Sequence, residues 1–474
     1  MSVVWWRLSS AAFAVCAALV PASVDPVQAQ SLEAALIQAY QSNPQLNAQR
    51  AATRAIDENV SIALGGYRPR IAATASSGEQ YLESINRVVA TTAAGTVTYP
   101  FASSMYNVTS IGGTLTQPLF NGFQTSNRTR QAEAQVFAAR ETLRTTEQQV
   151  LLNAVSAYMN VLRDSAILEL QRSNVNVLEA QLRQVRDRFN VGEVTRTDVA
   201  QSESRIAAGT SSMQNAEGNF ISSRAVFRQV IGTEPGRLIA GMPVDRFLAR
   251  SRDAAIAAGR DSHPTVLAAM YAVDAAQSQV KIAEGALAPT VNLQGTVTKS
   301  WGSSTAANTL ESLSGLAAIQ MTAPIYQGGQ EYATIRQAKE TLGQRRLDLD
   351  TQREQAQATV VQAWGLLETS RAQIESTTAQ VRAAEIALNG VREEARVGQR
   401  TTLDVLNAQQ ELVTARGALV TAQRDRVVNS YTALAAMGRL SPQILGLRVE
   451  TYDAMVHYQQ TRDSWSGVRT PDGR

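Results

Sequence analysis

Most of the chain consists of two copies of one pattern, and this repeat restricts the fold more than any other feature of the sequence. SNPQLNAQRAA at 42–52 is similar to SHPTVLAAMYA at 262–272, and TQPLFNG at 116–122 is similar to TAPIYQG at 322–328. Such a repeat indicates two structural units of one design that pack on each other. The first pair is 220 residues apart and the second 206, so we expect a longer loop between 76 and 116 in the first copy.

Two long proline-free blocks have the spacing of helices. No proline lies between Pro118 and Pro235, or between Pro324 and Pro442. Apolar residues of the first block recur at steps of three and four, at Val175, Leu178, Leu182, Val185 and Phe189. This heptad spacing is typical of coiled coils. It predicts long helices over about 123–190 and 329–396, each a rod of roughly 100 Å at 1.5 Å per residue.

The part of each copy before the long helix alternates with a period of two. In TVNLQGTVTKS at 290–300 and AAIQMTAPI at 317–325, apolar and polar residues take alternate places, which predicts strands. We expect β-hairpins at about 69–119 and 289–326, with polar loops at 301–309 and about 78–104. The alternation fits a sheet packed on a core, or a barrel with lipid outside and water inside. Four strands are too few to close a bacterial barrel of ~8 strands or more, so a barrel requires several chains.

The N-terminus has the features of an export signal. Arg7 is followed by the apolar run AAFAVCAALV at 11–20 and by Val27-Gln28-Ala29, a small-residue cleavage site. Ten apolar residues are fewer than the ~20 that a membrane-spanning helix needs. The only cysteine, Cys16, lies inside this segment, so disulfides and thiolate chemistry are not expected. Because no other run approaches that length, entry into a membrane would require a closed β structure.

Several function classes are disfavoured by the composition. The net charge is +3 and the pI about 9.0, but the basic residues are scattered and not interleaved with aromatic ones, which argues against nucleic-acid binding. His263 and His457 have no ligand residues at metal-binding spacing, and His263 precedes Pro264 in an expected turn. No phosphate-binding, dinucleotide-binding or nucleophile motif occurs. We therefore expect no enzymatic activity, metal or cofactor.

Two similar polar turns follow the long helices, RFNVGEVTRTDV at 188–199 and ARVGQRTTLDVL at 395–406. Each has an Asp six residues after a V-G pair. A purely structural interpretation is available: the glycines end one helix, while Thr197 with Asp198, and Thr401 or Thr402 with Asp404, cap the next. This interpretation is compatible with a role for the same turns in gating.

With these features together, the sequence from about 31 to 437 resembles the TolC-like outer membrane channels. The resemblance implies a mainly α fold with a transmembrane β-barrel, built as a homotrimer. Four strands per chain then form a 12-stranded barrel in outer membrane lipid, and the long helices form a periplasmic α-barrel. It implies passive exit for the substrates of a tripartite efflux pump or a type I secretion system. The partners are a periplasmic adaptor and an inner-membrane transporter of the ABC or RND type.

The resemblance also assigns roles to residues of the two turns. The adaptor-binding tips correspond to Val191, Gly192, Glu193, Val397, Gly398 and Gln399. The periplasmic gate corresponds to Asp198, Arg400, Asp404, Asn407 and Ala395. In a trimer each of these residues becomes a ring of three, and converging carboxylates attract cations. The family more often has Leu at the position of Glu193, an acid at that of Asn407 and an aromatic residue at that of Ala395. We expect an altered adaptor fit, a weaker cation trap and a looser gate.

This gives an expected layout along the chain: an export signal at 1–29, a first copy at 30–235 with its tip turn at 191–198, an equatorial linker at 236–260, a second copy at 261–440 with its tip turn at 397–404, and a polar C-terminal tail at 441–474. The expected location is the outer membrane of a Gram-negative bacterium, with a long periplasmic portion. An alternative is a periplasmic coiled-coil adaptor or structural rod, which would share the helices but not the strands.

Overall fold

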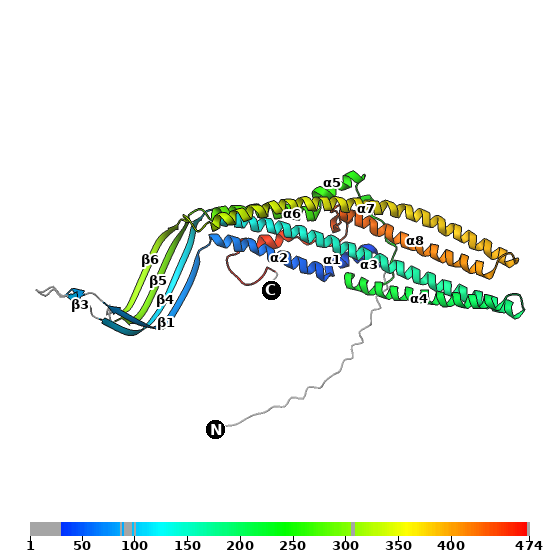
Figure 1. The fold of residues 1–474 in the computed structure, drawn as a ribbon, viewed down its shortest axis with the longest axis horizontal. Coiled ribbons are helices and arrows are strands. Elements are labelled where there is room, and N and C mark those ends of the chain that lie inside the picture. The colour runs from blue at the N-terminus through cyan, green and yellow to red at the C-terminus, as the bar shows by residue number, and fades with distance from the viewer. Residues whose placement is uncertain (1–29, 86–87, 90–96, 99–100, 305–308, 472–474) are drawn as a thin grey trace, which may run out of the picture.

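A computed structural model describes residues 30–471, apart from 86–87, 90–96, 99–100 and 305–308. The molecule is elongated, with a β-sheet at one end, a layer of helices in the middle and two helical hairpins at the other end (Figure 1). The expected export signal at 1–29 lies outside the described residues.

Four antiparallel strands form the main sheet, in the order β1-β4-β5-β6. They are β1 (Arg70–Ile85), β4 (Phe101–Asn121), β5 (Thr290–Ser304) and β6 (Thr309–Thr322), and a small second sheet joins β2 (Val88–Val89) to β3 (Val97–Thr98). The expectation of a loop over 78–104 is wrong for most of that segment. The β1–β4 pairing continues unbroken from Gly78–Val108 to Ile85–Phe101, because each further pair adds backbone hydrogen bonds.

The register gives the sheet one polar and one apolar face. Ser76, Ser110, Ser300 and Ser312 are paired in one row across all four strands. The opposite face carries apolar pairs, including Ile71 with Leu115 and Leu293 with Ile319. Ile71 is 80% exposed and Ile319 69% exposed. No described segment of the chain therefore covers the apolar face.

Each hairpin of strands leads into a very long helix. β4 leads into α3 (Gln124–Asn190), and β6 leads into α7 (Gln330–Arg396), each of 67 residues. The chain then turns back into α4 (Arg196–Ile231) and α8 (Thr402–Ala436), which pack on α3 and α7 respectively. None of the helices among the described residues combines the length and hydropathy needed to cross a bilayer.

Shorter helices complete the layer between the sheet and the middle of the molecule. They are α1 (Leu32–Ser42), α2 (Pro44–Leu64), α5 (Arg252–Ser262) and α6 (Pro264–Gly285). Asn43 separates α1 from α2, and His263 separates α5 from α6. Each of these residues precedes a proline, and its side chain caps the following helix. The Nδ1 atom of His263 lies 3.3 Å from the backbone nitrogen of Thr265, so His263 occupies the turn that the sequence predicts.

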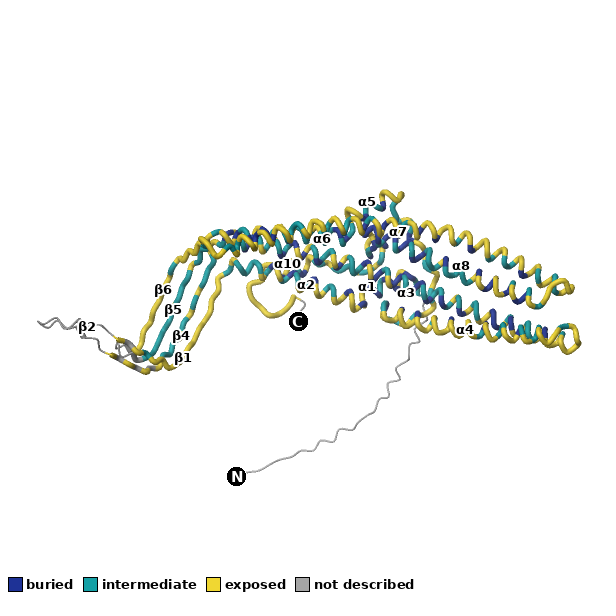
Figure 2. The backbone as a smooth tube through the Cα atoms, in the orientation of Figure 1, coloured by how far each residue is buried: buried dark blue, intermediate teal, exposed yellow. Residues whose placement is uncertain are grey.

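The largest core lies in the middle of the molecule, where α1, α3, α7 and α8 meet, and Figure 2 shows buried backbone concentrated there. The connecting segment after α4 is anchored to this region. The Asp245 carboxylate pairs with Arg371 of α7 and Arg426 of α8, and the N–H of Val244 donates to Ser430 Oγ. Burial alone would raise the pKa of Asp245, but the two arginines lower it below its usual value.

The C-terminal tail is ordered along α2. It contains α9 (Pro442–Leu445) and α10 (Ala454–Thr461), and α10 packs on α2. Although Asp453 lies four residues before His457 in the sequence, the fold pairs His457 Nδ1 with Asp57 Oδ2 at 3.1 Å. The two residues are 400 positions apart, a distance at which sequence spacing carries no information on contact.

Candidate functional site

The two tip turns have the same backbone geometry. Gly192 has φ +80° and Gly398 has φ +81°, the left-handed conformation in which helices commonly end. The N–H of Glu193 donates to the carbonyl of Arg188 at 2.9 Å, and that of Gln399 to the carbonyl of Glu394 at 2.9 Å. A Cβ on either glycine would meet no atom within 4 Å. The glycines are thus required by backbone conformation and not by close approach of another group.

The turns project exposed side chains from the end of the molecule that is farthest from the sheet (Figure 1). Val191 is 77% exposed and Val397 69% exposed. Glu193 forms an ion pair of 2.8 Å with Arg188, whose hydrogen bond and charge lower the pKa of Glu193. Gln399, at the equivalent position, has no charge. The two tips therefore share a valine and a glycine but differ in electrostatics.

The predicted gate carboxylates form capping boxes at the start of the return helices. Asp198 Oδ2 accepts from the N–H of Thr195 at 2.9 Å, while Thr195 Oγ1 accepts from the N–H of Asp198 at 3.4 Å. Thr401 and Asp404 repeat the arrangement at 3.0 and 3.2 Å. The capping interpretation is correct for both helices, but Thr195 and not Thr197 is the first cap. A capping box needs the acid three residues after the hydroxyl, and Thr195 has this spacing.

Hydrogen bonds from the threonines lower the pKa of both carboxyls. A folded-state pKa below the unfolded value means that each box stabilises its helix at neutral pH. This stabilisation is lost as the pH falls through the folded-state pKa.

Each of the other predicted gate residues has a hydrogen-bond partner of its own near the tips. Arg400 lies in the turn before the cap of α8, and its Nε donates to Glu394 Oε2 of α7 at 2.8 Å. Ala395 is in the last turn of α7, where its carbonyl accepts from the N–H of Gly398. Asn407 lies on α8 and accepts from Arg205 Nη2 of α4 at 2.6 Å. Asn407 therefore links the two helical hairpins, through a partner that sequence reasoning missed.

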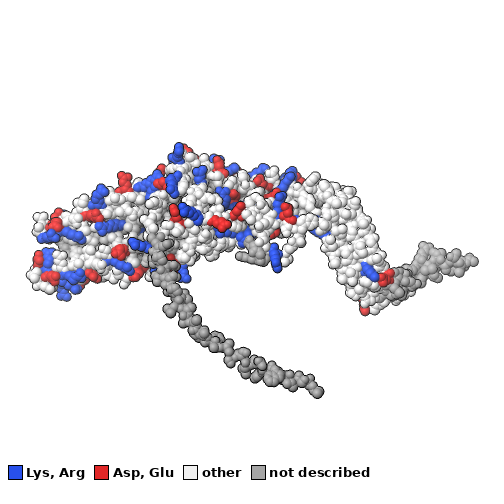
Figure 3. Space-filling view, turned by 180° about the vertical axis from the view of Figure 1, so that it is seen from behind, with Lys and Arg blue, Asp and Glu red and all other residues white. Residues whose placement is uncertain are grey.

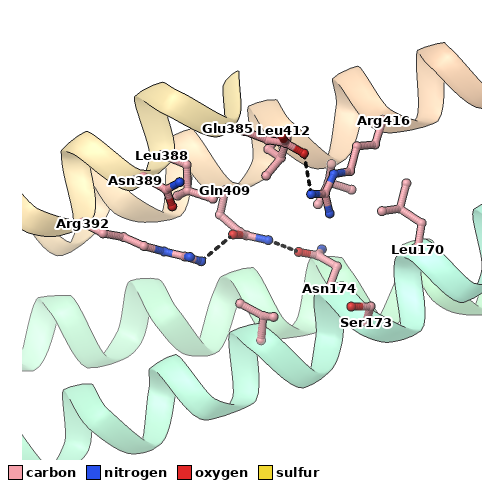
Figure 4. A pocket seen from close by; sticks show the side chains of 12 residues that line it. Leu170, Ser173, Asn174, Glu385, Leu388, Asn389, Arg392, Gln409, Leu412 and Arg416 are labelled. Atoms are coloured by element: carbon pink, nitrogen blue, oxygen red, sulfur yellow. Dashed lines mark hydrogen bonds and ion pairs between the residues drawn. The ribbon is translucent and has the colours of Figure 1, made fainter. Parts of the chain in front are cut away.

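A second polar link between the hairpins lies further from the tips (Figure 4). Arg392 donates to Gln409 Oε1 at 2.9 Å, and Gln409 Nε2 lies 3.4 Å from Asn174 Oδ1 of α3. Asn174 and Gln409 are both buried. Sequence reasoning also missed this link, although Gln409 follows the apolar pair Val405 and Leu406 at heptad spacing. A polar residue at such a position indicates a specific partner across the interface.

Among the residues that the structure describes, no three His, Cys, Asp or Glu side chains are grouped in a way that could hold a metal ion.

Replacing Thr195 by Ala should destabilise the first turn of α4 by about 1 kcal/mol, because the side-chain cap is lost. We expect amide exchange in that turn to become roughly fivefold faster, measured by hydrogen–deuterium exchange. Thr197→Ala is the matched control, since Thr197 is exposed and only two residues away. Equal acceleration in the two variants would contradict the assignment of the cap.

Comparison with known proteins identifies the family. The family model described as "Outer membrane efflux protein" matches residues 35–233 and 256–439. The outer membrane efflux protein BepC of Brucella suis biovar 1 is 40% identical over 454 residues, which cover 94% of this chain and 93% of that protein. The outer membrane protein TolC of Escherichia coli K12 is 26% identical over 435 residues, with coverage of 88% and 84%.

Solved structures agree on the fold. The CmeC outer membrane channel of Campylobacter jejuni superposes with a TM-score of 0.71 at 15% identity, over 91% of this chain and 89% of that chain. The sequence-based expectations of an outer membrane export component and of a protein without enzymatic activity are confirmed. This chain, with its four-stranded sheet and two long helical hairpins, belongs to the outer membrane efflux protein family.

Proposed function

We propose that three copies of this chain form a channel-tunnel that gives passive exit to the substrates of a tripartite efflux pump or a type I secretion system. The observation that carries the proposal is the sheet, whose uncovered apolar face lies at one end of helical rods of roughly 100 Å. Family membership supports the outer membrane location. A periplasmic coiled-coil adaptor or rod would not require a sheet with an uncovered apolar face.

Lipid is the occupant that suits the apolar face. The main strands are 14 to 21 residues long, more than the ~9–11 that a tilted strand needs to cross a bilayer. On the visible side, the sheet surface is almost free of charged side chains except near its far end (Figure 3). Lys299 and Glu311 form an ion pair on the apolar face, near the end of the sheet that is far from the helices. Lys299 also lies 5.1 Å from the Trp301 ring. Aromatic and charged residues of this kind are typical of the membrane–water boundary.

The edges of the sheet support assembly. β1 and β6 have no further strand partner among the described residues. Long open edges promote uncontrolled pairing in water and leave unsatisfied backbone groups in lipid. Pairing β6 of one copy with β1 of the next removes every edge once the ring closes. Three copies give twelve strands, which exceeds the ~8 of the smallest barrels.

The helical part offers surfaces for the same assembly. Several large apolar side chains of α2 and α7 are more than half exposed, namely Ile62, Leu347, Leu366 and Ile386. Contact between neighbouring copies would bury them and continue the duct through the periplasm.

Cysteine crosslinking tests the closed ring, and the chain suits it because Cys16 lies in the expected export signal. One cysteine replaces Ser76 on β1, and a second replaces Ser312, Ser314 or Leu316 on the same face of β6. We expect at least one pair to give a ladder of covalent dimers and trimers on denaturing gels, with nothing larger. Each single-cysteine variant serves as a control. Species beyond three chains, or no crosslink in any pair, would contradict the trimer.

We place adaptor docking at the tips, because Val191-Gly192-Glu193 and Val397-Gly398-Gln399 are exposed and lie farthest from the sheet. A photoreactive residue at Val191 or Val397 should capture a periplasmic adaptor in cells, identified by mass spectrometry. The matched control is the same residue at Leu313 on the apolar face of the sheet, which should capture no adaptor. Capture from Leu313 alone would refute docking at the tips.

We assign the gate to the same end of the molecule. In the trimer Asp198, Arg400 and Asp404 would form charged rings around the entrance. Asn407 gives a weaker cation trap than an acid, and Ala395 a looser closure than an aromatic residue. The hydrogen bond between Arg205 and Asn407 supports closure, because it holds the two hairpins of one chain together.

Asp404→Ala tests the gate. Because the carboxylate ring attracts cations, its loss should lower the single-channel cation conductance of the purified trimer and weaken block by divalent cations. Because Asp404 also accepts the Thr401 hydrogen bonds, Thr401→Ala is the matched control that disturbs the cap and keeps the charge. An equal effect of both variants would assign Asp404 to capping alone.

A further inference from the structure

The C-terminal tail reaches the junction between α2 and β1, where Ser464 contacts Arg68, and we define residues 447–465 as the C-terminal strap. From the middle of the molecule the strap follows α2 toward the sheet. Its successive contacts are with Tyr40 of α1, Asp57 of α2 and Arg68 in the junction that follows α2. The strap therefore extends to the point where the helices meet the strands.

Two contacts, one partly buried and one buried, fix the course of the strap. The N–H of Tyr452 donates to the Tyr40 hydroxyl at 3.2 Å, and the Arg50 guanidinium lies 4.5 Å from the Tyr40 ring and 5.5 Å from the Tyr452 ring. Further along, His457 pairs with Asp57, whose side chain is fully buried. Burial raises the pKa of the Asp57 carboxyl, while the His457 hydrogen bond and the charge of Arg140, 3.9 Å away, oppose the rise.

The last contact positions a large aromatic side chain. Arg68 Nη1 donates to the carbonyl of Ser464 at 2.6 Å, and Ser61 Oγ donates to the same oxygen at 3.3 Å. The Arg68 guanidinium also lies 4.7 Å from the centre of the Trp465 ring. Trp465 is nevertheless 71% exposed. A tryptophan held at a defined place but left in contact with solvent indicates an external partner.

The surroundings of Trp465 combine aromatic and apolar groups with positive charge. Tyr67 is 51% exposed, and Ile71, which lies on the apolar face of the sheet, follows four residues later. Within the described part of the chain, no carboxylate lies within 4.0 Å of the Arg68 guanidinium, so this group contacts the Trp465 ring without an ion-pair partner.

We propose that Trp465, Tyr67 and Arg68 form an anchor that binds phospholipid headgroups at the periplasmic surface of the outer membrane. Trp and Tyr rings are stable at the level of the headgroups, and arginines attract phosphate. The C-terminal strap acts as a fixed arm that delivers Trp465 to this level. The inference rests on the proposed function, because only the membrane-embedded sheet brings the junction to a lipid surface.

Tryptophan quenching by brominated phospholipids tests the anchor in the full-length protein. Single-tryptophan variants retain Trp465, Trp301 or Trp364, with phenylalanine at the other positions, and are reconstituted in vesicles of zwitterionic and anionic phospholipid. Trp301 reports on the sheet, and Trp364 lies in the middle of α7, where its Nε1 donates to Glu368. Bromine near the headgroup end of the acyl chains should reduce the emission of Trp465 and leave that of Trp364 unchanged.

The outcomes distinguish failure of the lipid anchor from failure of the proposed channel. Quenching of Trp301 without quenching of Trp465 overturns the anchor and leaves the channel intact, whereas absence of quenching at both positions overturns the channel as well. Arg68→Gln should reduce quenching of Trp465 in anionic vesicles and leave Trp301 unaffected. Arg345→Gln, an exposed arginine of α7, is the matched control and should change neither signal. Equal quenching in the Arg68 and Arg345 variants would exclude electrostatic recognition by Arg68.

Discussion

The pairing of β4 with β5 is the contact on which the rest of the structure depends, because it joins the two halves of the chain. It runs from Thr109–Trp301 to Asn121–Thr290. β4 continues into α3, and α6 leads into β5, so the pairing also fixes α3 beside α6. The backbones approach closely there, and a Cβ on Gly122 would lie 2.3 Å from the carbonyl oxygen of Gly285. Because neither glycine has a Cβ, α3 and α6 can pack closely at the point where the β4–β5 pairing ends.

From that junction outward, the kind of contact between helices changes. In the middle, apolar side chains around Tyr158 and Phe227 form the largest core. Toward the tips, the contacts between the hairpins include polar pairs such as Arg205–Asn407 and Gln409–Asn174. Water can replace such hydrogen bonds at a modest net cost, whereas separating an apolar core costs free energy in proportion to its area. The gate that we propose at the tips requires this difference, because the hairpin ends must move while the middle of the molecule stays packed.

Periodicity in the sequence carries much of this architecture. Heptad spacing places the long helices where they are observed, and alternation locates the strands, because both patterns report which face of an element is buried. Alternation did not reveal where the strands stop, since β1 continues through polar residues as far as Ile85 on backbone pairing alone. Local hydrogen-bond geometry likewise decided that Thr195 caps α4, although Thr197 is nearer to the acid.

The sequence alone determined the family, the alternation of strands with long helices, and the two glycine turns, all of which follow from local spacing and backbone preference. The tertiary structure alone decided which side chains meet: Asn407 with Arg205, His457 with Asp57, and Trp465 with Arg68. Periodicity identifies the buried face of an element but not its partner, and the partners in these pairs are about 200 to 400 residues apart.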